Sequence, residues 1–312
     1  MPANLTHPAT ESADQRFADL DAWPPEIVLE LLWESQLAAI AAVRPALGPL
    51  ARACRTAALR LAEGGRIVYI GAGTSGRIAV QDGAELGPTF GWPAARLLLL
   101  PAGGPEALIR SVENAEDSSE AAADAVRSHA IGARDVVLGI AASGTTPYTL
   151  AFLTLARRAG ALTIGIANNP GTPLLAAAEC PVLVETGAEA IAGSTRLKAG
   201  TAQKVVLNLF SSVVMILLNH VYRGRMVDLE ITNAKLGRRA VRTVAELAGA
   251  SEEDAARLLA RAAGSVKRAL LLARGLSPEA AEILLARCGG NLRAALASLD
   301  PPGDAPPGLP LS

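Results

Sequence analysis

The chain has few aromatic residues and few cysteines. The first shortage limits the fold classes that it can adopt, and the second limits the kinds of covalent and metal sites that it can form. Aromatic residues make up 3% of the 312 residues, whereas half of the residues are hydrophobic. This composition favours helices packed closely on a parallel sheet over an all-β sandwich. The three cysteines, Cys54, Cys180 and Cys288, are isolated and have no CxxC spacing. They predict neither a disulfide framework nor a zinc site, and they suit a reducing compartment.

The chain also has no excess of charge of one sign, and its first segment does not resemble an export signal. Lys and Arg total 29 against 30 Asp and Glu, so no overall positive field attracts nucleic acid or an anionic membrane. The first segment contains acids and prolines but no apolar signal core. The longest apolar stretch, 205–218, is shorter than the ~20 residues of a membrane span and predicts a buried helix. We therefore expect a cytoplasmic protein that binds neither nucleic acid nor membrane.

Short apolar runs that alternate with helical stretches predict a parallel sheet. The runs show no alternation of polar and apolar residues, so each strand should be covered on both faces. We expect a doubly wound α/β fold with a five-stranded parallel sheet. The five runs are 66–70, 96–100, 135–140, 162–167 and 181–185.

Helical segments flank the predicted sheet on both sides. We expect an N-terminal helical arm at 1–55, a domain built on the parallel sheet at 56–245, a small C-terminal helical bundle at 250–300 and a disordered, proline-rich tail at 301–312. Three residues typical of helix N-caps mark helix starts in the bundle: Ser251, Ser277 and Asn291.

Hydroxyl-rich turns follow two of the predicted strands. The carboxyl ends of parallel strands line the ligand crevice, and glycines with hydroxyls ahead of a helix suit an anion. Either turn alone is equally well explained as a helix cap, whereas two at neighbouring strand ends favour one phosphate site. The first turn matches neither the Walker nor the dinucleotide pattern. The hydroxyl residues are Thr74 and Ser75 in GAGTSGR, and Ser143, Thr145 and Thr146 in AASGTTP.

A third polar cluster precedes the apolar helix. It contains Ser194, Thr195, Arg196 and Lys198. Hydroxyls beside two cations suit a substrate carboxylate or phosphate, and for each single residue helix capping or a solvated charge is an equal alternative.

Several segments together resemble a known family. They include GGRIVYIGAGTSGR, AGGPEALIRSVENAED, GSTRLKAGTAQKVVLN and MVDLEITNAKL. In this order they resemble the N-acetylmuramic acid 6-phosphate etherases, which have the sugar isomerase (SIS) fold and end in a ubiquitin-associated-type (UBA-like) bundle. The resemblance implies that Thr74, Ser75, Ser143 and Thr146 hold a sugar phosphate. It also implies cleavage of a lactyl ether to N-acetylglucosamine 6-phosphate and D-lactate, by elimination and then addition of water, without metal or cofactor.

Such an elimination needs a base for the C2 proton and an acid for the departing oxygen. Glu85 lies on the predicted helix after the first turn, so we expect it to face the same crevice. Glu116 lies in VENAED. By resemblance Glu85 matches the family's proton donor, and Glu116 matches its second active-site glutamate, which we assign as the base. Without the resemblance, either is more simply a solvated side chain.

The sequence departs from the family pattern around these residues. Ala84 replaces the usual serine before the first glutamate, Leu86 and Gly87 replace the usual Cys-Pro, and Thr145 replaces an arginine. No catalytic carboxylate or phosphate-binding hydroxyl is lost. We expect the reaction class to be retained, with a different substrate preference or rate.

Two other functions share the fold. A non-catalytic sugar-phosphate regulator needs no acid and base, so the presence of both glutamates opposes it. An aldose–ketose isomerase needs a base beside C2, but the etherase-type segments after Ile191 oppose it. Sugar isomerase domains are commonly dimers, so the resemblance implies a homodimer, for which the apolar helix at 205–218 could serve as interface or core.

Overall fold

The computed structural model describes residues 8–300, so the predicted tail lies outside the described residues. The chain divides into two compact units. One contains the residues up to Leu86 and Pro93–Val214, and the other contains Gly87–Trp92 and the residues from Met215 onward. The division comes earlier than the predicted boundary at 245, because a helix before that boundary packs with the C-terminal helices.

The first unit is built on a five-stranded sheet in which every strand pair is parallel. The strand order is β2-β1-β3-β4-β5. This confirms the doubly wound fold, and the strands lie at Ile67–Gly71 (β1), Leu97–Pro101 (β2), Val136–Ile140 (β3), Leu162–Ala167 (β4) and Cys180–Leu183 (β5). Because β1, β3 and β4 are buried along their whole length, their uninterrupted apolar sequences are explained.

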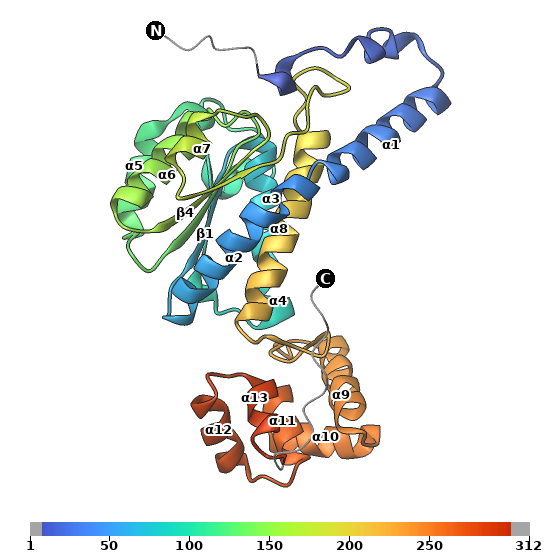
Figure 1. Ribbon diagram of the computed structural model, residues 1–312, viewed down its shortest axis with the longest axis vertical. Coiled ribbons are helices and arrows are strands. Elements are labelled where there is room, and N and C mark those ends of the chain that lie inside the picture. The colour runs from blue at the N-terminus through green and yellow to red at the C-terminus, as the bar shows by residue number, and fades with distance from the viewer. Residues whose placement is uncertain (1–7, 301–312) are drawn as a thin grey trace. The chain divides into compact units, whose positions relative to one another are not determined.

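Helices cover both faces of this sheet (Figure 1). On one face lie α2 (Leu47–Ala62), α3 (Gly73–Ala84) and α8 (Lys198–Leu217), and on the other α5 (Ser119–Ser128), α6 (Pro147–Arg158) and α7 (Pro173–Ala177). Val68, Ile70 and Val137 pack against Phe152 and Leu153 of α6 in one fully buried cluster.

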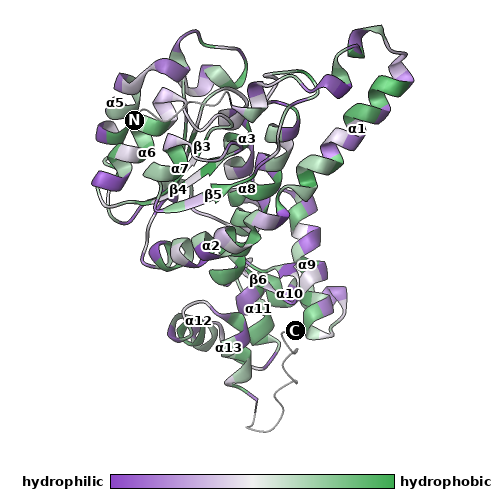
Figure 2. Ribbon diagram, turned by 45° about the horizontal axis from the view of Figure 1, so that its top comes forward, coloured by the Kyte–Doolittle hydropathy of each residue, from purple (hydrophilic) through white to green (hydrophobic). Residues whose placement is uncertain are grey.

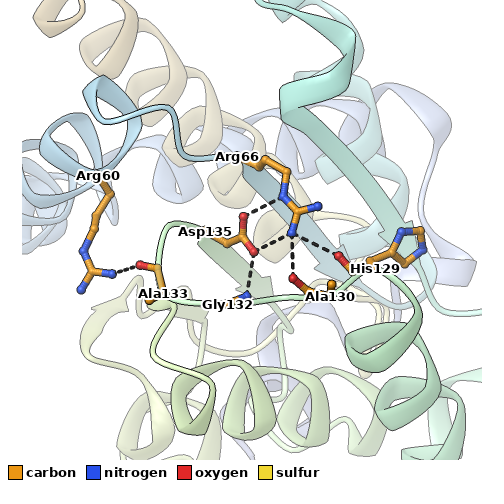
Figure 3. Close-up of polar contacts among 7 residues, drawn as sticks. All are labelled: Arg60, Arg66, His129, Ala130, Gly132, Ala133 and Asp135. Atoms are coloured by element: carbon orange, nitrogen blue, oxygen red, sulfur yellow. Dashed lines mark hydrogen bonds and ion pairs between the residues drawn. The ribbon is translucent and has the colours of Figure 1, made fainter.

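A partly buried ion pair joins the beginnings of β1 and β3 (Figure 3). Arg66 donates to both carboxylate oxygens of Asp135 at 2.8 Å, and the backbone N–H of Gly132 donates to the same carboxylate at 2.9 Å. The strands pair from Ile67 with Val136 to Gly71 with Ile140. The two turns that follow β1 and β3 therefore begin side by side.

The described residues ahead of α2 form the predicted helical arm. Three short 3₁₀ helices, Ala9–Glu11, Gln15–Phe17 and Leu20–Ala22, precede α1 (Pro25–Ala41), and a fourth, Arg44–Ala46, joins α1 to α2. Figure 1 shows α1 extending away from the sheet. Among the described residues one helix, α8, is long and apolar enough to cross a membrane, but half of the relevant window is buried. The helix expected to be buried at 205–218 is therefore buried on one face only, and Leu209, Val213, Ile216 and Leu217 are exposed.

The second unit is a hairpin followed by a helical bundle. The hairpin strands are Val221–Tyr222 (β6) and Arg225–Met226 (β7), and the helices are α9 (Ala234–Ala248), α10 (Glu252–Arg261), α11 (Val266–Leu272), α12 (Pro278–Arg287) and α13 (Leu292–Ala297). Leu236, Ala240 and Val244 of α9 share one core with the later helices. The side chains of Ser251, Ser277 and Asn291 accept from backbone N–H groups as N-caps, which confirms those helix starts. The UBA-like character of the bundle stays a prediction.

Candidate active site

The first turn leads from β1 into α3, where one glycine allows very close packing and another allows a left-handed backbone conformation. A Cβ on Gly76 would lie 2.7 Å from the carbonyl oxygen of Gly71, so a larger residue does not fit. Gly73 has a left-handed φ of +53°, which glycine adopts without strain. Thr74 and Ser75 lie in the first turn of α3, with Ser75 buried. The positive end of the helix dipole and these hydroxyls together suit an anion.

The second turn follows β3 and is folded back on itself. The backbone N–H of Thr145 donates to Ser143 Oγ at 3.2 Å, and Ser143 Oγ lies 3.5 Å from Thr146 Oγ1. Gly144 has a φ of +69°. Its carbonyl accepts from Leu174 N at 3.0 Å, which attaches the turn to the segment after β4.

Gly144→Ala is expected to destabilise the protein, because the new methyl group would lie 2.3 Å from Thr172 Oγ1. Gly171→Ala is the matched control: Gly171 has a φ of +68° but no atom within 4 Å of its Cβ position. Urea unfolding should show a loss for Gly144→Ala exceeding that of the control by about 1 to 3 kcal/mol. Equal losses would mean that the contact with Thr172 does not matter.

The third cluster lies at the start of α8, beside the first turn. The Cβ position of Gly200 is 3.4 Å from Thr74 Cγ2, so the beginnings of α8 and α3 are in contact. Ser194 and Thr195 are half-buried, Arg196 is exposed and Lys198 is buried. Burial lowers the pKa of Lys198, and the nearby Glu189 carboxylate partly offsets this. Two predicted clusters are therefore neighbours in space.

Glu189 is a buried carboxylate that the sequence analysis did not single out. Its two oxygens accept from the backbone N–H groups of Lys198 and Ala199, each at 2.9 Å, and its side chain is fully buried. It therefore accepts hydrogen bonds from two backbone N–H groups at the start of α8 that have no partner within the helix. An acid just ahead of the GSTRLK segment was the available signal.

Glu189→Ala is expected to lower the free energy of unfolding by about 2 kcal/mol, because two buried N–H groups lose a charged acceptor. The control is Glu185→Ala, which removes an exposed carboxylate four residues earlier and should change stability by less than about 0.5 kcal/mol. Thermal and urea unfolding of both variants test this. Similar stabilities would show that the cap is dispensable.

The N-terminal arm connects two of these loops. Asn169 Nδ2 donates to Thr10 Oγ1 at 3.0 Å and to the Ala142 carbonyl at 2.9 Å. The Thr10 carbonyl accepts from Gly193 N at 3.0 Å, and Thr10 is fully buried. Thr10 thus holds together the segment before Ser143 and the GSTR segment.

One of the two predicted catalytic glutamates lines a cavity at the first turn. The cavity has a volume of about 230 Å³ and contains Ala72 and Gly73 at the start of α3, Arg77, and Glu116 with its neighbours Glu113 and Asn114. Glu116 lies in the short helix Ala115–Asp117, which begins after Asn114 in a left-handed conformation. Arg77 Nε donates to the Ala107 carbonyl at 2.9 Å. Glu116 therefore shares a cavity with the start of α3.

Glu85 lies at the opposite end of α3, as its exposed C-cap residue. α3 is twelve residues long, which corresponds to about 18 Å. Glu85 does not line the cavity that contains Glu116, so a single chain does not bring the two carboxylates together there. Its role as proton donor stays a prediction, as do the roles of the other predicted site residues.

Buried Asp82 fixes the last turn of α3, one turn before Glu85. It accepts from Tyr69 Oη at 2.8 Å, Asn208 Nδ2 at 2.7 Å and Ser211 Oγ at 3.2 Å. Burial and the Asp82 carboxylate raise the pKa of Tyr69 well above its usual value. Because Asp82 binds both β1 and α8, the backbone around Glu85 is held in place.

Two family models match overlapping parts of this chain. Residues 112–213 match the SIS domain family, and residues 49–157 match the glucokinase regulatory protein N-terminal SIS domain. A phosphoheptose isomerase from Francisella tularensis is similar in structure, with a TM-score of 0.48 and 19% identity, over 62% of this chain and 100% of that chain. The parallel sheet, the paired turns and the family matches define a protein with an SIS domain.

Curated relatives show to which family of SIS-domain proteins the chain belongs. An N-acetylmuramic acid 6-phosphate etherase of Deinococcus radiodurans is 49% identical over 265 residues, covering 85% of this chain and 87% of that relative. One from Cronobacter sakazakii is 44% identical, covering 86% and 91%. The chain belongs to the N-acetylmuramic acid 6-phosphate etherase family.

Proposed function

We propose that the protein is an N-acetylmuramic acid 6-phosphate etherase. It would cleave the bond between C3 of the sugar and the lactyl oxygen, releasing D-lactate and forming N-acetylglucosamine 6-phosphate. The observation that carries the proposal is the cavity in which Glu116 lies with the start of α3. A phosphate held at the helix start would place the sugar within reach of a carboxylate base.

The proposed chemistry divides between anchoring groups and proton-transfer groups. The hydroxyls of Thr74, Ser75, Ser143 and Thr146 hold the phosphate. Further oxygens of the substrate are bound by Ser194, Thr195, Arg196, Lys198 and the exposed Thr145. Glu116 removes the C2 proton of the ring-opened sugar, and the electron pair moves to expel lactate from C3. Glu85 protonates the departing lactate oxygen. Water then adds to C3, and a proton returns to C2.

We further propose that two copies of the chain form the working enzyme, with Glu85 of one copy completing the site of the other. The separation of Glu85 from the cavity supports this arrangement. An apolar stripe on α1 offers a surface for a second copy: Leu29 is 67% exposed and Trp33 is 62% exposed, and Leu37 and Ile40 continue the stripe. Figure 2 shows hydrophobic residues along α1. Burying such a stripe in a symmetric dimer is favourable.

The proposed location is the cytoplasm. The three cysteines are all free, which suits a reducing compartment. The substrate is a phosphorylated sugar, and such molecules are retained inside the cell by their charge.

The activity is tested by incubating the purified protein with N-acetylmuramic acid 6-phosphate. We expect D-lactate and N-acetylglucosamine 6-phosphate in equal amounts, and much slower turnover of unphosphorylated N-acetylmuramic acid. Absence of lactate would reject the proposal. In that event, binding without turnover would indicate a regulator, and formation of a ketose would indicate an isomerase.

A further inference from the structure

A second cavity lies wholly within the C-terminal unit. Its volume is about 370 Å³, larger than that of the cavity at Glu116. The hairpin contributes Gly224, Arg225 and Met226, and α9 contributes Lys235, Arg238, Arg239, Arg242, Thr243 and Glu246. None of these residues lines the cavity at Glu116.

The lining of this cavity carries a large excess of positive charge. Its one carboxylate, Glu246, already forms an ion pair with Arg225 at 2.6 Å. Lys235, Arg238, Arg239 and Arg242 form no ion pair within residues 8–300. The whole chain has almost equal numbers of acids and bases, so this is a local concentration of cations.

The arrangement of these cations along α9 is unfavourable without a ligand. Arg238 and Arg242 are four residues apart, as are Lys235 and Arg239, so like charges lie next to each other on the helix surface and repel. A bound anion would remove this repulsion. Guanidinium groups also present paired N–H donors that match two oxygens of one phosphate group.

We propose that the cavity between the β6–β7 hairpin and α9 binds a small phosphorylated anion. Its volume is in the range of small-molecule sites. Its lining includes no aromatic side chain on which nucleic acid bases could stack. Met226 is its single large apolar side chain, which leaves little surface for an apolar peptide anchor. These features favour a small anion over a macromolecule.

Equilibrium dialysis with labelled inorganic phosphate at constant ionic strength tests the site. The test variant is Arg238→Gln/Arg242→Gln. Its control, Arg257→Gln/Arg261→Gln, removes the same charge at the same spacing from α10, outside the cavity. A third variant, Ser75→Ala/Ser143→Ala, weakens the predicted phosphate site at the turns, so that the two sites can be told apart.

We expect the wild type and the α10 control to bind two phosphates per chain. Arg238→Gln/Arg242→Gln should bind phosphate at the cavity at least about tenfold more weakly, whereas Ser75→Ala/Ser143→Ala should retain this binding. Identical binding by the test variant and the α10 control would overturn the proposal. If the turns bind no phosphate, Ser75→Ala/Ser143→Ala binds the same amount of phosphate as the wild type. The comparison of Arg238→Gln/Arg242→Gln with the α10 control still shows whether the cavity binds phosphate.

Two further arms identify the source of the anion. If the natural ligand is a sugar phosphate, unlabelled glucose 6-phosphate should displace labelled phosphate from the cavity. If the cavity accepts only the free ion, unlabelled inorganic phosphate should displace the label and glucose 6-phosphate should not. Either result supports a small-anion site. A single-stranded oligonucleotide that binds through Arg238 and Arg242 while phosphate does not would contradict it. Circular dichroism should confirm that the variant is folded, because both side chains are exposed.

Discussion

Glu116→Gln is expected to lower the rate of D-lactate release by about 10²- to 10⁴-fold, which is the usual contribution of a positioned general base. The change keeps the size of the side chain and removes its ability to accept a proton. Glu116 is exposed and has no hydrogen bond or ion pair to another described residue. The variant should therefore fold normally. A coupled assay for D-lactate measures the rate.

The control for this variant is Asp117→Asn, which removes the adjacent carboxylate. Asp117 is exposed and does not line the cavity, so we expect a rate near that of the wild type. A wild-type rate for Glu116→Gln, or an equal loss for Asp117→Asn, would contradict the assignment of the base.

Glu85→Gln is expected to slow lactate release by a similar factor, about 10²- to 10⁴-fold, because the leaving oxygen loses its proton donor. Glu63→Gln is the matched control, since Glu63 is likewise an exposed C-cap residue, at the end of α2. The control should leave the rate unchanged. If Glu85→Gln behaves like the control, Glu85 has no part in catalysis.

Mixing the two inactive variants tests the proposed sharing of the site. In a mixed dimer with a shared site, one site carries both substitutions and the other carries neither. Random pairing should therefore restore about a quarter of the wild-type rate. If both glutamates act within one chain, every site in the mixture stays defective and no activity returns.

The fold was predictable because its signals are local. Continuous apolar runs define buried strands, and Ser251 and Ser277 cap the helices that follow them. The boundary between the two units was not predictable in the same way. From the sequence alone, the apolar face of α9 could pack either on the sheet domain before it or on the helices after it. The tertiary contacts of Leu236 and Val244 place α9 with the later helices.

The candidate site was predictable only in part. The glycines of GAGTSGR and SGTTP indicated the turns, whereas Glu116 stood out from Glu113 and Asp117 only through the family resemblance. The contact between Thr10 and Asn169 spans 159 positions of sequence, and no local pattern predicts such a pair. For Glu85, the sequence predicted the helix correctly, but the length of α3 places it far from the turn.

The most direct test of the mechanism is to follow hydrogen exchange at C2 of N-acetylmuramic acid 6-phosphate in deuterium oxide. The product of the wild-type enzyme should carry deuterium at C2. Exchange into the substrate should persist in Glu85→Gln, where only departure of lactate is blocked, and should disappear in Glu116→Gln. Product without deuterium, or exchange that survives in Glu116→Gln and is lost in Glu85→Gln, would contradict the assigned roles.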